Sequence, residues 1–183
     1  KIKISTTKPM LHIIIDQFMA NGFNDFVIVV GYRKEDIMDY FGDGSGFGVN
    51  IEYVVQSDIC GGTADAVKCA EPALPERRSA FALVFGDVVP TQDDIASIYQ
   101  SYVTNQLQCV KRGIPCNSNG VMAVRTVNDP QRFGVVELDE DNCVTRLVEK
   151  SPNPPTNLIN AGIYILPMSI FMHIHATQRS ERG

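Results

Sequence analysis

The sequence lacks the marks of several large classes of protein. Its apolar runs fall short of the roughly 18 residues that a membrane-spanning helix needs, and it shows no secretory signal. It has no basic cluster, and its net charge of −5 disfavours a nucleic-acid-binding face. We therefore expect neither a membrane nor a nucleic acid as a partner. A small anionic ligand is still compatible, because backbone N–H groups at helix starts hold phosphate without net positive charge.

The common motifs of thiol, metal and dinucleotide chemistry are also missing. The five cysteines form no C-x-x-C pair and lie scattered at Cys60, Cys69, Cys109, Cys116 and Cys143. Such a set predicts reduced thiols in a cytoplasmic protein rather than a disulfide framework or a zinc ribbon. The three histidines show no metal-like spacing, so we interpret them as solvent or core residues: His12, His173 and His175. No Ser-His-Asp or Cys-His arrangement is readable, and no G-x-G-x-x-G follows a first strand, which argues against a dinucleotide-binding oxidoreductase.

What the first 112 residues do contain is an alternation of helices and apolar strands. Helical spacing or helix signals predict helices over 11–19, 34–41, 64–70 and 93–102. Apolar, β-branched runs predict strands over 26–30, 49–55 and 80–85. Wholly apolar strands are typical of a parallel sheet buried on both faces. The alternation predicts right-handed β-α-β units with helices on both faces of the sheet.

After Gly113 the pattern changes to strands joined by short turns. We expect strands over 121–127, 134–138, 144–149 and 159–166, a hairpin turn at 139–142 and a short helix over 167–175. The prolines between 152 and 155 exclude regular structure there, and we assign no element to 106–119. The predicted fold is α/β, a Rossmann-like, mostly parallel sheet with an antiparallel or mixed extension. It forms one domain, with residues 1–112 as its first half and residues 113–183 as its second.

Polar and glycine residues follow two of the first strands. Ligands of open α/β sheets bind outside the carboxyl ends of the strands, where Gln56, Gly61-Gly62-Thr63 and Asp87 fall. The Gln56 amide offers a donor and an acceptor, which suits the edge of uracil or thymine. Asp87 could bind Mg²⁺ together with substrate phosphates. The alternatives are a polar strand end before a helix capped by Thr63, and a turn or capping role for Asp87.

Two further groups lie in the second half. Glu149 and Lys150 end a strand, and adjacent residues of a strand point to opposite faces, so we expect one of them to face the cleft. Solvated charge at a strand end is the alternative. Asn160-Ala161-Gly162 opens the next strand, and its small residues would let a ligand lie against the backbone. Gly162 would equally mark a β-bulge.

Taken in order, these pieces resemble the sugar-1-phosphate nucleotidylyltransferases. The resemblance runs from about Lys8 to Gly183 and rests on the order of the motifs K-P-M-L, V-G-Y, Y-F-G-D-G, Q-x5-G-T-A-x-A, F-G-D, F-G-V-V-E-L, V-E-K and L-I-N-A-G-I-Y-I-L. The strings P-P-T-N-L-I-N-A-G-I-Y and S-E-R-G are most similar to the glucose-1-phosphate thymidylyl- or uridylyltransferases, including archaeal forms that also act on N-acetylglucosamine-1-phosphate.

The resemblance implies roles for individual residues. Gln56 would read a pyrimidine base, Asp87 would bind Mg²⁺, and Lys150 would contact the phosphate of the sugar. Asp87 and Lys150 are thereby the implied catalytic residues. The implied nucleotide-binding residues are Gln56, Gly61, Gly62, Thr63 and Gly86. The implied sugar-phosphate-binding residues are Gly134, Glu149, Lys150, Asn160, Ala161, Gly162 and Tyr164.

Two departures from the family pattern stand out. The family's opening strand, its glycine-rich loop ending in G-T-R-L and the catalytic lysine after it have no counterpart in the sequence, since Lys8-Pro9 matches a second K-P at a helix start. The second metal-binding aspartate would lie beyond Gly183. With no initiator Met at Lys1, we expect the sequence to be part of a longer chain.

The implied activity is transfer of a nucleotidyl group from UTP or dTTP to glucose-1-phosphate or N-acetylglucosamine-1-phosphate, releasing pyrophosphate. The resemblance also implies Mg²⁺ as cofactor and a cytoplasmic homo-oligomer. Two alternatives stay open. One is a mannose-1-phosphate guanylyltransferase, although relatives of that kind often carry an acidic residue where Gln56 stands. The other is a regulatory module that binds sugar nucleotide without chemistry.

Overall fold

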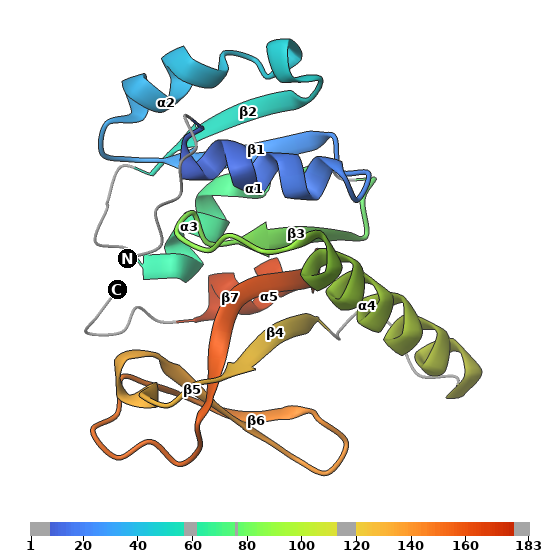
Figure 1. Cartoon of the computed structure of the whole chain (residues 1–183). Helices are drawn as coiled ribbons and strands as arrows, with labels where there is room; N and C mark the ends of the chain where they lie inside the picture. The colour runs from blue at the N-terminus through green and yellow to red at the C-terminus, as the bar shows by residue number, and fades with distance from the viewer. Residues whose placement is uncertain (1–7, 57–61, 76, 113–119, 178–183) are drawn as a thin grey trace.

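The computed structural model describes residues 8–56, 62–75, 77–112 and 120–177, and its first half is built around a parallel pair of strands (Figure 1). Strands β1 (Asp25–Val30) and β2 (Asn50–Val55) pair in parallel over six residues each. Helix α1 (Met10–Met19) leads into β1, and helix α2 (Lys34–Phe41) connects β1 to β2. The predicted helices and strands of this region are confirmed to within one residue at each end.

The second half is organised by its longest strand. Strand β7 (Leu158–Pro167) pairs antiparallel with β3 (Ala80–Val84), with β4 (Val121–Thr126) and with β5 (Gly134–Leu138), and β5 pairs with β6 (Val144–Glu149). Strands β4 to β7 form the predicted antiparallel extension, whereas the expectation that β3 is a third strand of the parallel sheet is wrong, because β3 pairs antiparallel with β7. Because β3 belongs to the first half of the sequence and β7 to the second, their pairing joins the two halves.

Helix α4 differs in length from the prediction. It runs over Gln92–Arg112, ten residues beyond the expected end of the helix 93–102. Ile95, Ile98 and Cys109 are its buried residues, and their helical spacing carries the buried stripe into the last turns. Exposed polar residues such as Thr104, Asn105 and Gln108 lie between them and mask that stripe in the sequence.

One face of the strands is covered by α1 and α4. Ile14 and Phe18 of α1 pack with Ile95 of α4, and Ala82 and Val84 of β3 lie against this cluster. All three of the large side chains are almost completely buried. This cluster holds α1 and α4 on the same side of the sheet.

The other face is covered by α3 (Gly62–Ala70) and α5 (Ile170–Ala176). Phe81 points to the opposite side of β3 from Ala82, and its ring stacks on Phe171 of α5 at 5.7 Å between centroids. Helix α3 contacts β1, β2 and α5. Helices therefore lie on both faces, as predicted.

The β5–β6 hairpin closes through the turn predicted at 139–142. Asp139 Oδ1 accepts hydrogen bonds from the backbone N–H groups of Asp141 and Cys143, at 3.0 and 2.8 Å. Asn142 takes a left-handed backbone conformation with φ +59. Among the described residues, 3-10 helices lie in other loops at Ser45–Phe47, Glu71–Ala73 and Pro130–Arg132.

Two further findings concern membrane-spanning helices and the cysteines. In the ranges that the structure describes, no helix combines the length and apolar character needed to cross a bilayer. Cys69, Cys109 and Cys143 are free thiols, and Cys60 and Cys116 lie outside the described residues.

Candidate functional site

The nucleotide-side residues gather at the carboxyl ends of the strands. The backbone N–H of Gln56 donates to Val30 O at 2.9 Å, so β1 and β2 end at the same edge. A cavity of about 1330 Å³ lies between β1 and β3, and its lining at this edge includes Gln56, Gly62, Thr63 and Gly86. The structure thus brings these four predicted residues together. Gly61 lies outside the described residues.

The Gln56 side chain is oriented by the start of α3. Its Nε2 donates to Asp65 Oδ2 at 3.1 Å and approaches Gly62 O at 3.5 Å. Sequence reasoning missed Asp65. The sequence signal that could have indicated Asp65 was its position as an acidic residue in the first turn of a helix, where the helix dipole favours a carboxylate. Because Asp65 accepts from one end of the amide, it fixes which end of Gln56 is donor and which is acceptor.

Asp87 is an exposed carboxylate just beyond β3. The turn that carries it is closed by the N–H of Val88, which donates to Phe85 O at 3.0 Å. Its alternative role as a cap for α4 is wrong, because Thr91 and Asp94 cap that helix. Asp94 Oδ2 accepts from Thr91 N at 2.8 Å, and Thr91 Oγ1 accepts from Asp94 N at 3.1 Å.

The described residues contain no group of three or more His, Cys, Asp or Glu side chains arranged to hold a metal ion. A lone exposed carboxylate nevertheless fits Mg²⁺, which often binds through one or two carboxylates and completes its shell with water and substrate phosphates. Asp87 is the predicted residue that could contribute such a ligand.

A second polar group is built on the first residues of β7. Asn160 Oδ1 accepts from Gly162 N at 2.9 Å, and Asn160 Nδ2 donates to Tyr164 Oη. Burial raises the pKa of Tyr164, and the charge of Glu149 adds to this, while the hydrogen bond from Asn160 lowers it. Asn160 and Tyr164 therefore present a neutral hydrogen-bonded pair next to a carboxylate.

This stretch of β7 is also irregular, as the bulge interpretation of Gly162 predicted. Met122 of β4 pairs with Tyr164 and Val124 pairs with Asn160, so one residue of β4 stands opposite three of β7. Gly162 has φ +75, and a Cβ there would lie 2.8 Å from Phe85 Cδ2. Both the backbone angle and the close approach require glycine. Ala161 is half-buried beside it.

Gly134 brings Glu149 against this group. The two residues pair across β5 and β6, and a Cβ on Gly134 would lie 2.8 Å from Glu149 Oε2 and 3.9 Å from Asn160 Cβ. The missing side chain leaves the space that the Glu149 carboxylate occupies. Gly134, Glu149, Asn160 and Tyr164 are therefore neighbours in space although they come from three strands.

The expectation that Glu149 and Lys150 point to opposite faces is wrong. Strand β6 ends at Glu149, and Lys150 takes a left-handed conformation with φ +45, so the alternation of a strand no longer applies. Lys150 N donates to Phe133 O at 3.0 Å, and its Nζ lies 3.7 Å from Glu149 Oε1. The two charges lie on the same side, with Lys150 exposed.

Phe85 connects the two groups of residues. Its N–H donates to Gly162 O at 3.0 Å, and its ring lies 5.8 Å from that of Tyr164. Since Asp87 comes two residues after Phe85, the carboxyl end of β3 and the Asn160–Tyr164 group share one edge of the molecule.

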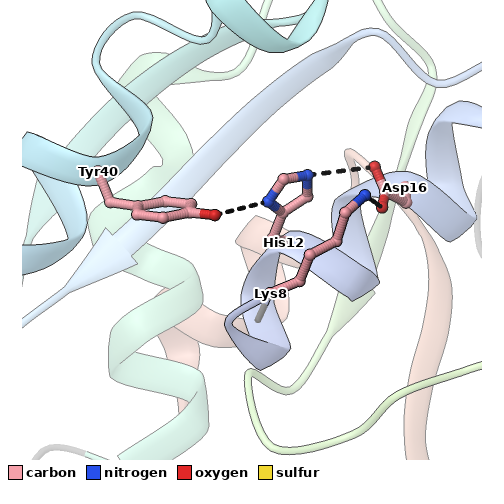
Figure 2. A network of polar contacts seen from close by, with 4 residues as sticks. All are labelled: Lys8, His12, Asp16 and Tyr40. Carbon is pink, nitrogen blue, oxygen red and sulfur yellow. Dashed lines mark hydrogen bonds and ion pairs between the residues drawn. The ribbon is translucent and has the colours of Figure 1, made fainter. Parts of the chain in front are cut away.

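A separate polar network joins α1 to α2 (Figure 2). Asp16 accepts from Lys8 Nζ at 2.8 Å and lies 3.5 Å from His12 Nε2, and His12 Nδ1 lies 2.9 Å from Tyr40 Oη. Sequence reasoning took His12 for a solvent or core residue. The i, i+4 spacing of His12 and Asp16 was the signal for this contact. No predicted site residue takes part, so we interpret the network as a structural link between the helices.

Comparison with known proteins identifies the fold and the family. The sequence matches the nucleotidyl transferase family over residues 1–183. The chain belongs to this family. It is 28% identical over 177 residues to the low-salt glycan biosynthesis nucleotidyltransferase Agl11 of Haloferax volcanii, covering 96% of this chain and 45% of that protein. It is 33% identical over 176 residues to the bifunctional protein GlmU of Methanocaldococcus jannaschii, covering 96% of this chain and 36% of that protein. The chain thus spans less than half the length of these curated relatives.

A solved structure shows the same fold. A Bacillus anthracis protein, provisionally described as a glucose-1-phosphate thymidylyltransferase and solved in complex with sucrose, superposes with a TM-score of 0.78 at 24% identity. The match covers 96% of this chain and 65% of that one. The predicted α/β fold and the predicted family are both confirmed.

Proposed function

We propose that the full protein transfers a nucleotidyl group from UTP or dTTP to a hexose-1-phosphate, giving a sugar nucleotide and pyrophosphate. The observation that carries this proposal is the junction at Phe85 and Gly162. Phe85 lines the same cavity as Gln56, donates its N–H to Gly162 O and packs beside Tyr164, so it connects the cavity to the Asn160–Tyr164 group. A nucleoside triphosphate and a sugar phosphate bound at the two groups would meet near the end of β3.

The proposed nucleotide side uses the ordered amide of Gln56. With Nε2 donating to Asp65, the amide oxygen is the acceptor that remains for a ring N–H of uracil or thymine. Gly62 and Thr63 start α3, whose first N–H groups favour an anionic or polar ligand group. This arrangement supports a pyrimidine nucleotide.

The proposed sugar side combines neutral and charged hydrogen-bonding groups. The Asn160–Tyr164 pair and the Glu149 carboxylate offer donors and acceptors suited to hexose hydroxyls, and Lys150 offers an exposed cation for the phosphate. Residues 1–112 would then supply the nucleotide half of the catalytic domain and residues 113–183 the sugar half.

Catalysis in this proposal needs no covalent enzyme intermediate. A sugar phosphate oxygen attacks the α-phosphorus in line, and the protein contributes positioning and charge neutralisation. When bound, Mg²⁺ supplies further neutralisation of the phosphates, and Asp87 would be its ligand on this chain. Lys150 would hold the attacking phosphate, and its contact with Glu149 restricts its position. We extend the proposal to a cytoplasmic homo-oligomer, as the family resemblance implies.

A substrate panel tests the function. Pyrophosphate release by the full-length protein is measured with UTP, dTTP, GTP, CTP or ATP and Mg²⁺, each with glucose-1-phosphate or N-acetylglucosamine-1-phosphate. We expect turnover with UTP or dTTP. Preference for GTP would support the guanylyltransferase alternative, and nucleotide binding without pyrophosphate release would support a non-catalytic module.

A further inference from the structure

Helix α4 carries two apolar stripes that run side by side, and only one of them is covered. The first contains Ile95, Ile98 and Cys109, whose side chains are buried. The second stays exposed or half-buried along the same helix. It consists of Ala96, Tyr99, Val103, Leu107 and Val110. We call these five residues the α4 stripe.

The spacing of the α4 stripe places its residues on one face of the helix. Successive members lie three, four, four and three residues apart, and side chains at these separations are neighbours on a helix surface. At about 3.6 residues per turn, the five side chains fall within an arc of about 80°. The opposite face carries exposed polar residues, among them Ser97, Ser101 and Gln108. The stripe is therefore a continuous apolar surface and not a set of scattered side chains.

The large side chains of the α4 stripe are strongly exposed. Tyr99 is 53% exposed, Leu107 is 56% exposed and Val110 is 69% exposed. Single exposed apolar residues are ordinary, but a row of them over about four helical turns indicates a surface that another molecule covers. Figure 1 shows the last turns of α4 extending away from the strands, so a second molecule has access to them.

The α4 stripe is symmetric about its middle residue. Tyr99 and Leu107 lie four residues before and after Val103. Ala96 and Val110 lie seven residues before and after it. A second α4 running in the opposite direction therefore places an apolar side chain opposite every member of the stripe. This is the self-complementarity that an interface between two identical chains related by a twofold axis requires.

The charges of α4 favour the same antiparallel arrangement. Asp93 and Asp94 lie in its first turn, and Lys111 lies in its last turn. Antiparallel pairing brings the acidic start of each helix near the lysine of the other, whereas parallel pairing would bring like charges together. Such exposed ion pairs add little to affinity, but they select the orientation of the two helices.

We propose that two copies of this chain associate through the α4 stripe, with the two α4 helices antiparallel and a twofold axis beside Val103. Leu107 of one copy then packs against Tyr99 of the other, and both apolar surfaces leave water. Because one helix pair is a small interface, we expect this contact to dissociate on dilution. The proposal names a surface for self-association and does not rest on the proposed activity.

Sedimentation of the full-length protein at several concentrations tests the surface. Leu107→Glu places a charge within the paired stripes and should raise the dissociation constant of the α4 contact at least about tenfold. Gln108→Glu is the matched control, because it adds the same side chain one residue later on the opposite face, and it should leave the constant unchanged. A wild-type protein that is monomeric at every concentration would overturn the proposal, as would equal association of the wild type and a folded Leu107→Glu variant.

Disulfide cross-linking tests the direction of the helices. In Val103→Cys the two introduced thiols lie beside the twofold axis and should form an intermolecular disulfide under mild oxidation. In Val110→Cys the two thiols would be about 20 Å apart along the helices, too far for a disulfide, whose Cα atoms lie within about 7 Å. The wild type, with the same native cysteines, gives the background. No cross-link above background in Val103→Cys, or equal cross-linking in the two variants, would contradict the antiparallel pairing.

Discussion

Gly134 and Glu149 pair across the β5–β6 hairpin so closely that a Cβ on Gly134 would meet the Glu149 carboxylate at 2.8 Å. The glycine thus determines where this carboxylate lies. It lies near enough to Tyr164 for its charge to raise the pKa of the phenol.

This relationship gives the first prediction. Gly134→Ala should displace the end of the Glu149 side chain and weaken sugar-1-phosphate binding about tenfold, a loss of about 1.4 kcal/mol, while nucleoside triphosphate affinity stays unchanged. Isothermal titration of the full-length protein with each substrate measures both. Gly46→Ala is the matched control, because a Cβ on Gly46 would meet nothing within 4 Å. Equal affinities in the two variants would contradict the role of Glu149.

The second prediction concerns the junction of the two halves. Gly162→Ala should destabilise the fold by about 3 kcal/mol, because it adds a left-handed alanine and a clash with Phe85. Gly22→Ala, at φ +84 with open space around it, should cost only about 1 kcal/mol from the backbone conformation. Urea unfolding of both variants measures the difference. Similar losses of unfolding free energy in the two variants would contradict this prediction and show that the Phe85 ring moves aside at little cost.

The third prediction uses the cap of α4. The Asp94 carboxylate accepts hydrogen bonds from the backbone and the side chain of Thr91, and these bonds lower the pKa of Asp94. A carboxyl group with a lowered folded-state pKa stabilises above its unfolded pKa, and this contribution disappears as the pH falls through the folded value. Thr91→Ala should therefore cost about 1 kcal/mol at pH 7 and less in acid. The test compares the unfolding free energies of Thr91→Ala and the wild type from pH 7 down through the folded-state pKa of Asp94. Asp93→Asn is the control, because it keeps the cap.

The fourth prediction addresses base selection. Asp65→Asn replaces the charged acceptor of Gln56 by an amide that can itself rotate, so the orientation of Gln56 is no longer fixed. The preference for UTP or dTTP over GTP should fall about tenfold, or about 1.4 kcal/mol. Competition binding measures this ratio, with Lys68→Gln on the same helix as control. An unchanged ratio would exclude orientation of Gln56 by Asp65 as a source of selectivity.

The fifth prediction concerns Asp87. In the full-length protein, Asp87→Asn should abolish turnover and leave the thermal unfolding midpoint unchanged, because the side chain is exposed and holds no capping bond to α4. Pyrophosphate release and thermal unfolding are compared with those of Asp93→Asn. Near-normal turnover would refute a metal-binding role.

Much of this fold could be predicted because its local signals agree with its packing. The apolar runs at β1 and β3 became strands, and the turn residues at 139–142 formed the hairpin turn. The length of α4 could not be read in the same way, because Thr104 and Asn105 have modest helix propensity and, together with other polar residues, hide a buried stripe that ends at Cys109.

The residues of the candidate site could be nominated from the sequence, but their contacts could not. The family resemblance supplied Gln56, Glu149 and Asn160, and the structure adds the bond from Gln56 to Asp65. The alternation of side chains along a strand predicts neither that contact nor the left-handed backbone of Lys150, because both depend on three-dimensional geometry. Alternation fails where the strand ends, which is why Lys150 lies beside Glu149.

The ten residues of β7 carry a consequence for how such a protein diversifies. Its later half is bonded to β3, whereas its earlier half meets the hairpin through a single pair, Val135 with Ile159. If the proposed function holds, substitutions or insertions in the hairpin would alter the choice of sugar phosphate while the residues around Gln56 keep their geometry. On that proposal, selection of the nucleotide donor and selection of the sugar acceptor could evolve independently.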